Sequence, residues 1–563
     1  MRIELYPVLP MALAAALVPL LGLGAGRVLA VAAPLISAWA ITGLPDGTRW
    51  QTDVLNLDLV PVRMDALARV FALAFALFAA LAGLYGASER SRAGRAGGLA
   101  LAAAGVGLVL AGDLLTLAFF WELLAVFSAL IVASSGRPGA RAAAARYLLL
   151  HAAGGACLLA GIVLRMPEAG LGADRIPLDG PAGFLLLAAF CMNAAVPPLH
   201  AWLPDAYPAA SPAGCVYLSA FTTKGAVAVL ARAFPGEDVL VWAGAAMALY
   251  GVVFAVLEND IRRLLAYHIV SQVGYMVCGI GMGTSLALDG TAAHAFCHIF
   301  YKGLLLMSAG AVLAATGRTA LTELGNLARP LRLVLVLMLV GGASISGVPL
   351  FSGFVSKSMV VSAAHDAGRP LVELLLTVAS MGTFLHTGLK LPWFTFFGPR
   401  TEPVPVQPVP LSMIAAMILA AAACVGIGVQ PGLLYALLPQ AAAYPKGGTY
   451  PPFTLDHVLE VLQLLAATAM AFVLLVRKLG GEPLRTADID RLYRRIIDVA
   501  LAASLTLLQR GERARSAMAA LPGQLLHRGW SLPEPALAGQ VLLTVLSAAA
   551  LIFGTWWLGS RGP

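Results

Sequence analysis

Apolar runs of about twenty residues recur along almost the whole chain, and a run of this length spans the hydrocarbon core of a bilayer as a helix. Hydrophobic residues make up 60% of the 563 residues, whereas charged residues make up only 12%. Soluble domains carry about twice that charged share. The sequence therefore predicts an all-α polytopic membrane protein with about 14–16 transmembrane helices. The expected helices cover residues 9–25, 27–45, 65–88, 97–112, 114–134, 144–165, 181–203, 213–234, 238–258, 264–287, 291–316, 331–363, 371–397, 409–428, 455–476 and 537–558.

Positive charges between the apolar runs predict the orientation. Arginines such as Arg90, Arg137, Arg262 and Arg318 fall in loops on one side, which is therefore expected to be cytoplasmic. The opposite loops are mostly acidic, and both termini are expected on this outer side. Because arginines in such loops act as topology signals, the net charge of +8 does not indicate a nucleic-acid partner. We expect a multi-pass protein in the lipid bilayer of a bacterial inner membrane.

Two of the expected helices contain helix-breaking residues. The seventh breaks at Pro197-Pro198, just after Asn193, and the twelfth breaks around Ser346-Gly347-Val348-Pro349. Broken backbone at membrane depth is tolerated where it is buried in protein or lines a cavity. The two breaks lie five helices apart and in helices of opposite direction, so helices 4–8 and 9–13 are expected to be inverted repeats, as in transporters.

These observations predict six regions. Three N-terminal helices precede two inverted repeats, which are followed by two further helices, a cytoplasmic amphipathic segment with a basic face, and a final transmembrane helix. The expected regions are 1–96, 97–236, 237–398, 399–480, 481–536 and 537–563.

Titratable side chains lie in the middle of several apolar runs. Three of them are spaced four apart, so they share one face of a helix. Ionisable residues within membrane spans almost always face a protein interior or a water-filled cavity, and they mark ion or proton paths. The candidates are Glu122, Lys224, His294, His298, Lys302, Lys357, His386 and Lys390.

Plainer explanations exist for some of these residues. Glu122 could lie at a membrane interface, and Lys224 or Lys390 could extend to one along its aliphatic stem. His294 and His298 could be satisfied core histidines or a metal pair, but no third ligand is apparent and Lys302 would repel a cation. We therefore expect no metal site.

Five motifs together resemble the antiporter-like subunits of respiratory complex I and of Mrp-type multisubunit Na+/H+ antiporters. The resemblance covers residues 65–400, and it is strongest to the D-type subunits of the Mrp group. The motifs are Trp121-Glu122-Leu123, the stretch from His200 to Tyr207, the stretch from Asp260 to Tyr275, the His-x3-His-x3-Lys run, and Ser352-Gly353-Phe354-Val355-Ser356-Lys357.

The resemblance implies a role for each matching residue and one departure. It assigns the proton or cation path to Glu122, Lys224, the trio on residues 294–302, and Lys357. In that family a lysine of helix 7 forms an ion pair with the helix-5 glutamate, but here Asn193 occupies its place. Asparagine cannot titrate, so the first half-channel is expected to be altered, inactive or specialised for another cation.

The expected function is therefore proton or cation translocation, as a D-like membrane component of a multisubunit Na+(K+)/H+ antiporter, with other membrane subunits as partners and H+ and Na+ or K+ as ions. A proton-pumping subunit of an NADH:quinone oxidoreductase or membrane-bound hydrogenase is the first alternative, and a non-transporting scaffold is the second. Residues 22–26 (Gly-Leu-Gly-Ala-Gly) follow no strand, so no nucleotide site is expected. We expect no cofactor and no catalytic redox site in this chain.

Overall fold

The computed structural model describes residues 5–54, 56–398, 404–444 and 447–480, together with the single residues 488, 495, 499 and 506. The chain divides into two units, Met1–Asp488 and Ile489–Pro563. The amphipathic segment expected over 481–536 lies outside the described residues, except for those four positions, and so does the final helix expected over 537–563. Everything below concerns the first unit.

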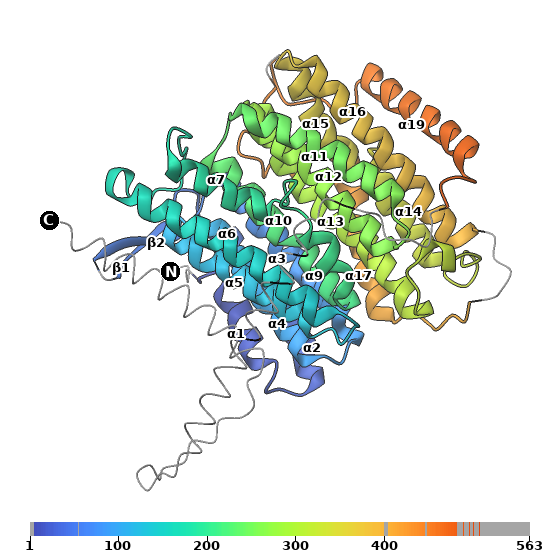
Figure 1. Ribbon diagram of the computed structural model, residues 1–563, viewed down its shortest axis with the longest axis horizontal. Helices are drawn as coiled ribbons and strands as arrows, with labels where there is room; N and C mark the ends of the chain where they lie inside the picture. The colour runs from blue at the N-terminus through green and yellow to red at the C-terminus, as the bar shows by residue number, and fades with distance from the viewer. Residues whose placement is uncertain are drawn as a thin grey trace, which may run out of the picture. The chain divides into compact units, whose positions relative to one another are not determined.

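Helices make up nearly all of the first unit (Figure 1). Within the described residues, twelve helices are long and apolar enough to cross a membrane, and Pro181–Asn193 and Arg332–Ser346 are shorter apolar helices. The helical polytopic architecture is therefore confirmed. The helices are α1 (Leu9–Leu17), α2 (Leu23–Gly43), α3 (Ala66–Tyr85), α4 (Arg92–Leu110), α5 (Leu114–Ala133), α6 (Ala140–Ala169), α7 (Pro181–Asn193), α8 (Trp202–Ala209), α9 (Pro212–Ala220), α10 (Thr222–Ala233), α11 (Asp238–Leu257), α12 (Ile261–Met282), α13 (Ser285–Thr316), α14 (Arg332–Ser346), α15 (Ser352–Asp366), α16 (Pro370–Thr383), α17 (Leu411–Val429), α18 (Gly432–Tyr435) and α19 (Leu455–Leu475).

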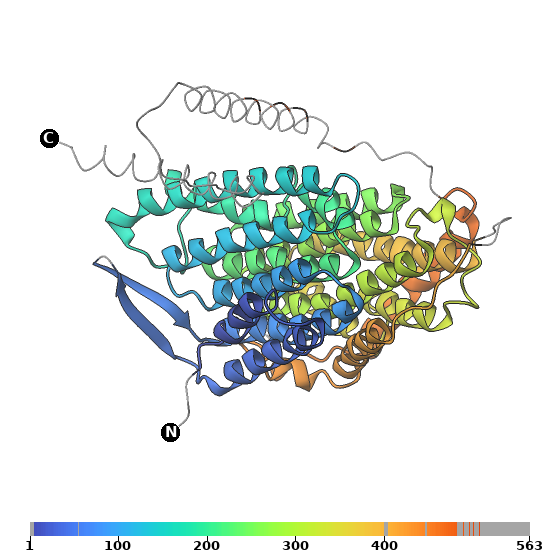
Figure 2. The same cartoon turned by 90° about the horizontal axis from the view of Figure 1, so that it is seen from below.

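The N-terminal part differs from the expectation in two ways. The helix expected over 9–25 is only nine residues long, because α1 ends at Leu17 and α2 begins at Leu23. A β-hairpin also follows α2, with strand β1 (Arg49–Val54) antiparallel to β2 (Leu57–Arg63). The hairpin lies at the edge of the helical body (Figure 2), and its Val60 amide donates a 2.7 Å hydrogen bond to the Asp113 carboxylate.

Both predicted breaks are present. The backbone is irregular between α7 and α8, where the Pro197-Pro198 peptide is cis, and again between α14 and α15. We call the five spans expected over residues 97–236 the first set of spans and the five expected over 237–398 the second set. In each set the fourth span is the broken one. Two interruptions were not predicted: α9 and α10 separate at Phe221, and α16 continues into two π-helical turns, η3 (Phe384–Lys390) and η4 (Trp393–Phe397).

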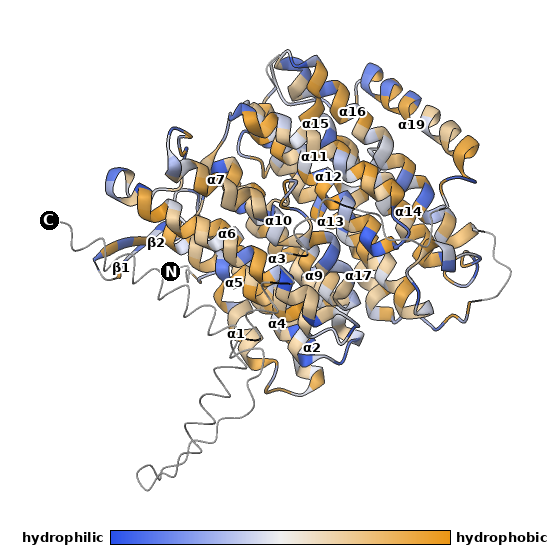
Figure 3. Cartoon of the chain, viewed as in Figure 1, coloured by the Kyte–Doolittle hydropathy of each residue, from blue (hydrophilic) through white to orange (hydrophobic). Residues whose placement is uncertain are grey.

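Helix α13 is the centre around which the other spans pack. It has 32 residues, is buried along almost its whole length, and contacts α3, α9, α12, α14, α15 and α17. Large apolar side chains are exposed on peripheral helices, for example Phe119, Phe184 and Leu474. Apolar colour accordingly covers the outer helix faces, and hydrophilic colour gathers mainly at helix ends (Figure 3). A chain with this surface is a multi-pass membrane protein, because lipid replaces water around its sides.

Candidate ion path

Glu122 begins the candidate path, on the face of α5 that meets α6. A Cβ atom added at Gly155 of α6 would lie 1.8 Å from the Glu122 Oε1 atom, so the carboxylate lies directly against the α6 backbone. Within the described part of the chain Glu122 forms no ion pair with a lysine. Glu122 is partly buried, and its carboxylate lies where α5 meets α6.

Asn193 ends α7 at the helix break and is completely buried. Neither the Nδ2 nor the Oδ1 atom of its amide forms a hydrogen bond with the described residues. A buried amide without partners is unusual, because desolvation costs it about 1–3 kcal/mol. The position expected to depart from the family pattern is therefore also an unsatisfied polar site.

Lys224 lies in the first turn of α10, next to the interruption at Phe221. Its Nζ atom donates hydrogen bonds to the Ser219 carbonyl at 2.8 Å and to the Thr223 hydroxyl at 3.1 Å. The Ser219 carbonyl is available because the helix is interrupted within the next two residues. Lys224 is fully buried, so it does not extend to the interface.

The three residues spaced four apart on α13 are all buried and share one face. His294 Nδ1 lies 3.2 Å from the Ser356 hydroxyl of α15, and the ring centroids of His294 and His298 are 6.1 Å apart. Neither His298 nitrogen has a hydrogen-bond partner among the described residues, and the same is true of Lys302 Nζ. Unsatisfied donors and acceptors therefore follow one another along the middle of the protein.

Lys357 lies beside the second predicted break and, like Lys224, is held by a backbone carbonyl and a hydroxyl. Its Nζ atom donates to the Ile345 carbonyl at 2.9 Å, just before α14 ends, and to the Ser380 hydroxyl at 3.3 Å. The ammonium also lies 5.2 Å from the centroid of the Tyr275 ring, a cation–π distance. The broken backbone thus supplies the acceptor for a buried lysine in both sets of spans.

A cavity of about 430 Å³ is lined by Lys357 and by residues near the C-terminal end of α15. Four carboxylates line it, with Lys357 at its inner wall. A cavity of this size has room for many water molecules, because one water needs only about 10–15 Å³ of such space. The acidic lining residues are Asp366, Glu373, Asp456 and Glu460.

His386 and Lys390 lie on the π-helical turn η3, beside a histidine to which the sequence analysis gave no role. The His386 and His268 rings are 4.5 Å apart, and His268 contacts the hydroxyls of Thr383 at 3.1 Å and Thr387 at 2.8 Å. The signal for His268 was present in the motif Ala266-Tyr267-His268, but no spacing rule set it apart. π-Turns occur frequently at functional sites.

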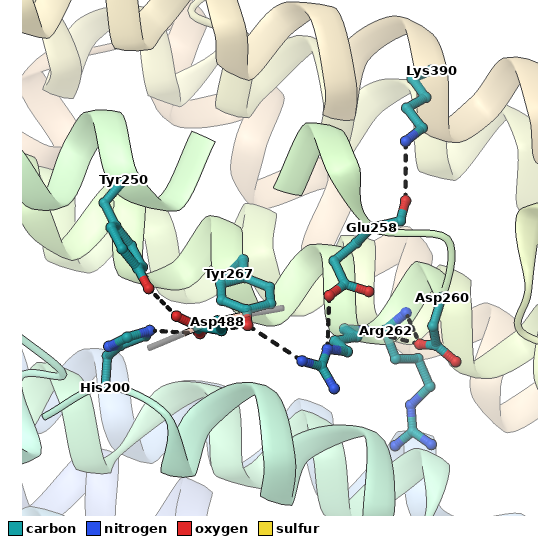
Figure 4. A network of polar contacts seen from close by, with 9 residues as sticks. His200, Tyr250, Glu258, Asp260, Arg262, Tyr267, Lys390 and Asp488 are labelled. Carbon is teal, nitrogen blue, oxygen red and sulfur yellow. Dashed lines mark hydrogen bonds and ion pairs between the residues drawn. The ribbon is translucent and has the colours of Figure 1, made fainter. Parts of the chain in front are cut away.

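Lys390 is almost fully buried, so the alternative of an interfacial lysine does not hold. Its Nζ atom donates to the carbonyl of Val256 at 2.5 Å. It also donates to the carbonyl of Glu258 at 3.0 Å, as Figure 4 shows. Both acceptors lie at the end of α11. Lysines 224, 357 and 390 are therefore all held by backbone carbonyls at helix ends or breaks.

Electrostatic interactions join these groups into one set. Lys224, Lys302 and Lys357 all lie within electrostatic range of His298. Lys302 and His386 likewise act on His268. Charges that interact in a dry interior titrate together, so a proton on one group changes the occupancy of the next. The arrangement suits stepwise proton transfer, and one end of it is the cavity at Lys357.

Comparison with known proteins places these motifs in a defined family. The family described as "NADH:quinone oxidoreductase/Mrp antiporter, TM" matches residues 111–385. The chain is 33% identical over 371 residues to an uncharacterized protein of Mycobacterium tuberculosis, covering 59% of this chain and 58% of the relative. It is 31% identical to the N-type subunit of the NADH-quinone oxidoreductase of Desulforudis audaxviator, over 51% of this chain and 62% of that one.

Further similarities link the chain to both kinds of complex. It is 24% identical to the D-type Na(+)/H(+) antiporter subunit of Bacillus subtilis, over 60% of this chain and 73% of that one. A chain of the Mrp complex from Dietzia sp. DQ12-45-1b superposes with a TM-score of 0.68 at 24% identity, covering 82% of this chain and 100% of that one. A chain of respiratory complex I from Thermus thermophilus superposes with a TM-score of 0.66 at 24% identity, covering 79% of this chain and 100% of that one. The chain therefore resembles the antiporter-like membrane subunits of both Mrp-type antiporters and respiratory complex I, and the family model matches its middle part, residues 111–385.

Proposed function

We propose that this chain is the proton- or cation-translocating membrane subunit of a multisubunit Na+(K+)/H+ antiporter of the Mrp type, similar to the D-type subunits of that group. One observation carries the proposal: buried protonatable side chains on α10, α13 and α15 form one interacting set that ends at the cavity beside Lys357. Ionisable groups at membrane depth are costly, so a protein retains a series of them only for a function that uses them.

In this scheme the proton moves between neighbouring side chains by charge coupling. Lys302 and His298 lie between Lys224 and Lys357, and no carboxylate forms an ion pair with these lysines in the described part of the chain. A positive charge on one group therefore disfavours a charge on the next. Arrival of a proton at Lys224 would drive the proton on Lys357 toward the cavity, where four carboxylates stabilise a cation.

The first part of the path works differently from that of the family, because Asn193 cannot carry a proton. Its unpaired amide could hold water between Glu122 and Lys224, since bridging water is nearly as good enthalpically as a direct hydrogen bond. Lys224 is then the first obligatory lysine. We further propose that residues 97–236 and 237–398 are the two inverted repeats, that the arginine-rich side is cytoplasmic, and that the membrane is a bacterial inner membrane.

A redox-driven complex is the second candidate. The similarity to an N-type subunit of an NADH-quinone oxidoreductase and to a chain of complex I favours it. In such a complex the same path would pump protons, and partner subunits would hold the flavin or iron-sulfur groups. A scaffold without transport remains the third candidate, supported by the absence of a titratable side chain at Asn193.

Purification of the complete complex from native membranes separates the first two candidates. Small antiporter subunits are expected to co-purify, whereas flavin or iron-sulfur subunits would contradict the antiporter proposal. The purified complex is then reconstituted in vesicles with an acidic interior, and Na+ or K+ is added outside. We expect loss of the pH gradient, reported by a fluorescent amine. An unchanged gradient with both cations would contradict cation/proton exchange.

A further inference from the structure

The side chain of Asp488 is buried at the junction of the two sets of spans, although it lies beyond the last described helix. Its exposed fraction is 0%, and so is that of His200, whose Nε2 atom lies 3.0 Å from Asp488 Oδ2. Tyr267 donates a 2.6 Å hydrogen bond to the same oxygen, and the Tyr250 hydroxyl donates to Oδ1. Figure 4 shows these three side chains converging on the carboxylate.

The three partners come from separate elements. His200 lies in the irregular segment between α7 and α8, just after the first helix break, whereas Tyr250 is on α11 and Tyr267 on α12. The rings also pack on one another: the His200 and Tyr250 centroids are 4.8 Å apart, and Phe254 lies against both tyrosines at 4.5 and 5.3 Å. Asp488 therefore occupies an aromatic pocket to which both sets of spans contribute.

The contacts extend from this pocket to the candidate ion path. The Tyr267 hydroxyl accepts from Arg263 Nη2 at 3.3 Å, and Arg263 Nε forms a 2.8 Å ion pair with Glu258. The backbone carbonyl of Glu258 in turn accepts from Lys390. A continuous series of polar contacts thus links Asp488 to a lysine of the second set of spans (Figure 4).

The chemistry of the pocket distinguishes an anchor from a proton carrier. Burial raises the pKa of the Asp488 carboxyl, but hydrogen bonding to His200 and the two tyrosines outweighs burial, and the pKa falls to about 2. A carboxylate stabilised in this way stays ionised throughout the physiological range. It therefore cannot load and release protons, and its directional contacts serve to fix position.

We propose that Asp488 is a positioning residue that ties the α7–α8 segment to α11 and α12, and so fixes the broken helix of the first set of spans. The expected effect on transport rests on the proposed function. The role of Asp488 in holding the α7–α8 segment in place does not. Loss of the carboxylate removes the hydrogen bonds that His200, Tyr250 and Tyr267 make to it, which loosens the segment around Pro197-Pro198.

Hydrogen–deuterium exchange of the complete complex, compared with its transport rate, tests this proposal. Asp488→Asn keeps the shape of the side chain but removes the charge, and Asp179→Asn is the matched control because Asp179 is exposed. We expect amides of residues 194–203 to exchange at least about tenfold faster in Asp488→Asn than in the control, with transport reduced several-fold. Tyr267→Phe is expected to shift both readouts in the same direction but less.

The outcomes separate the two proposals. Unchanged exchange in both Asp488→Asn and Tyr267→Phe overturns the tie, and faster exchange with wild-type transport overturns its positioning role. Absence of transport by the wild-type complex contradicts the proposed function but leaves the exchange comparison valid. If the complex with Asp488→Asn does not assemble, Tyr267→Phe alone tests whether Asp488 holds the segment, because this variant removes one hydroxyl and no charge.

Discussion

Replacement of Lys357 is expected to block ion flux in a way that depends on the replacing side chain. Lys357→Ala leaves no group that can carry a proton beside the cavity, so flux should fall to the background level. Lys357→Glu should retain part of the flux, because a carboxyl group can also bind and release a proton, and the Ile345 carbonyl and Ser380 hydroxyl remain as its neighbours.

The energetic cost of Lys357→Ala is small enough for the protein to remain folded. Hydrogen bonds made by a charged group contribute about 1.5–3 kcal/mol to stability, and a desolvated cation–π contact contributes about 2 kcal/mol. Removal of a buried charge offsets part of this loss, because the ammonium no longer has to be desolvated. The expected change in the free energy of unfolding is therefore no more than about 3 kcal/mol.

Proton flux into vesicles that contain the purified complex measures the effect, and the thermal unfolding of each variant serves as the folding control. Lys478→Ala is the matched control, because Lys478 is an exposed lysine beyond α19. The complex that carries this variant should transport normally. Flux through Lys357→Glu that is no greater than through Lys357→Ala would refute the exchange role of this position.

Two further predictions concern the first part of the path. Lys224→Ala should impair transport far more than Asn193→Ala, because only the lysine can hold a proton, and equal losses in flux assays would contradict this order. Gly155→Ala should lower flux with little change in thermal stability, because the added Cβ would lie 1.8 Å from Glu122 Oε1 and the flexible carboxylate must move away. Wild-type flux in Gly155→Ala would show that the position of the carboxylate does not matter.

The sequence predicts those parts of the fold that depend on strong local signals. Apolar runs identified the spans, and proline and glycine identified the breaks after Asn193 and Ser346, because both residue types disrupt helical hydrogen bonding. The interruption at Phe221 had no such signal, since Phe221 is followed by Thr222-Thr223 and no proline or glycine lies within it. Only tertiary contacts distinguish this interruption from a continuous helix.

In the candidate site, too, local relations could be predicted from the sequence, whereas tertiary contacts could not. Spacing placed His294, His298 and Lys302 on one face, as observed, because that relation is local. The contact between His200 and Asp488 joins residues 288 positions apart, so no periodicity can reveal it. Backbone carbonyls that hold Lys224 and Lys357 are equally invisible in a sequence, because every residue has one.

The proton flux of Lys302→Ala, measured in the intact complex, tests the central claim most directly. Lys302 lies fully buried on α13, in the second set of spans, and its Nζ atom has no partner among the described residues that could explain a purely structural role. The account predicts an assembled complex with flux at the background level. An assembled complex that transports at more than about half the wild-type rate would contradict it, because a central relay site cannot be dispensable.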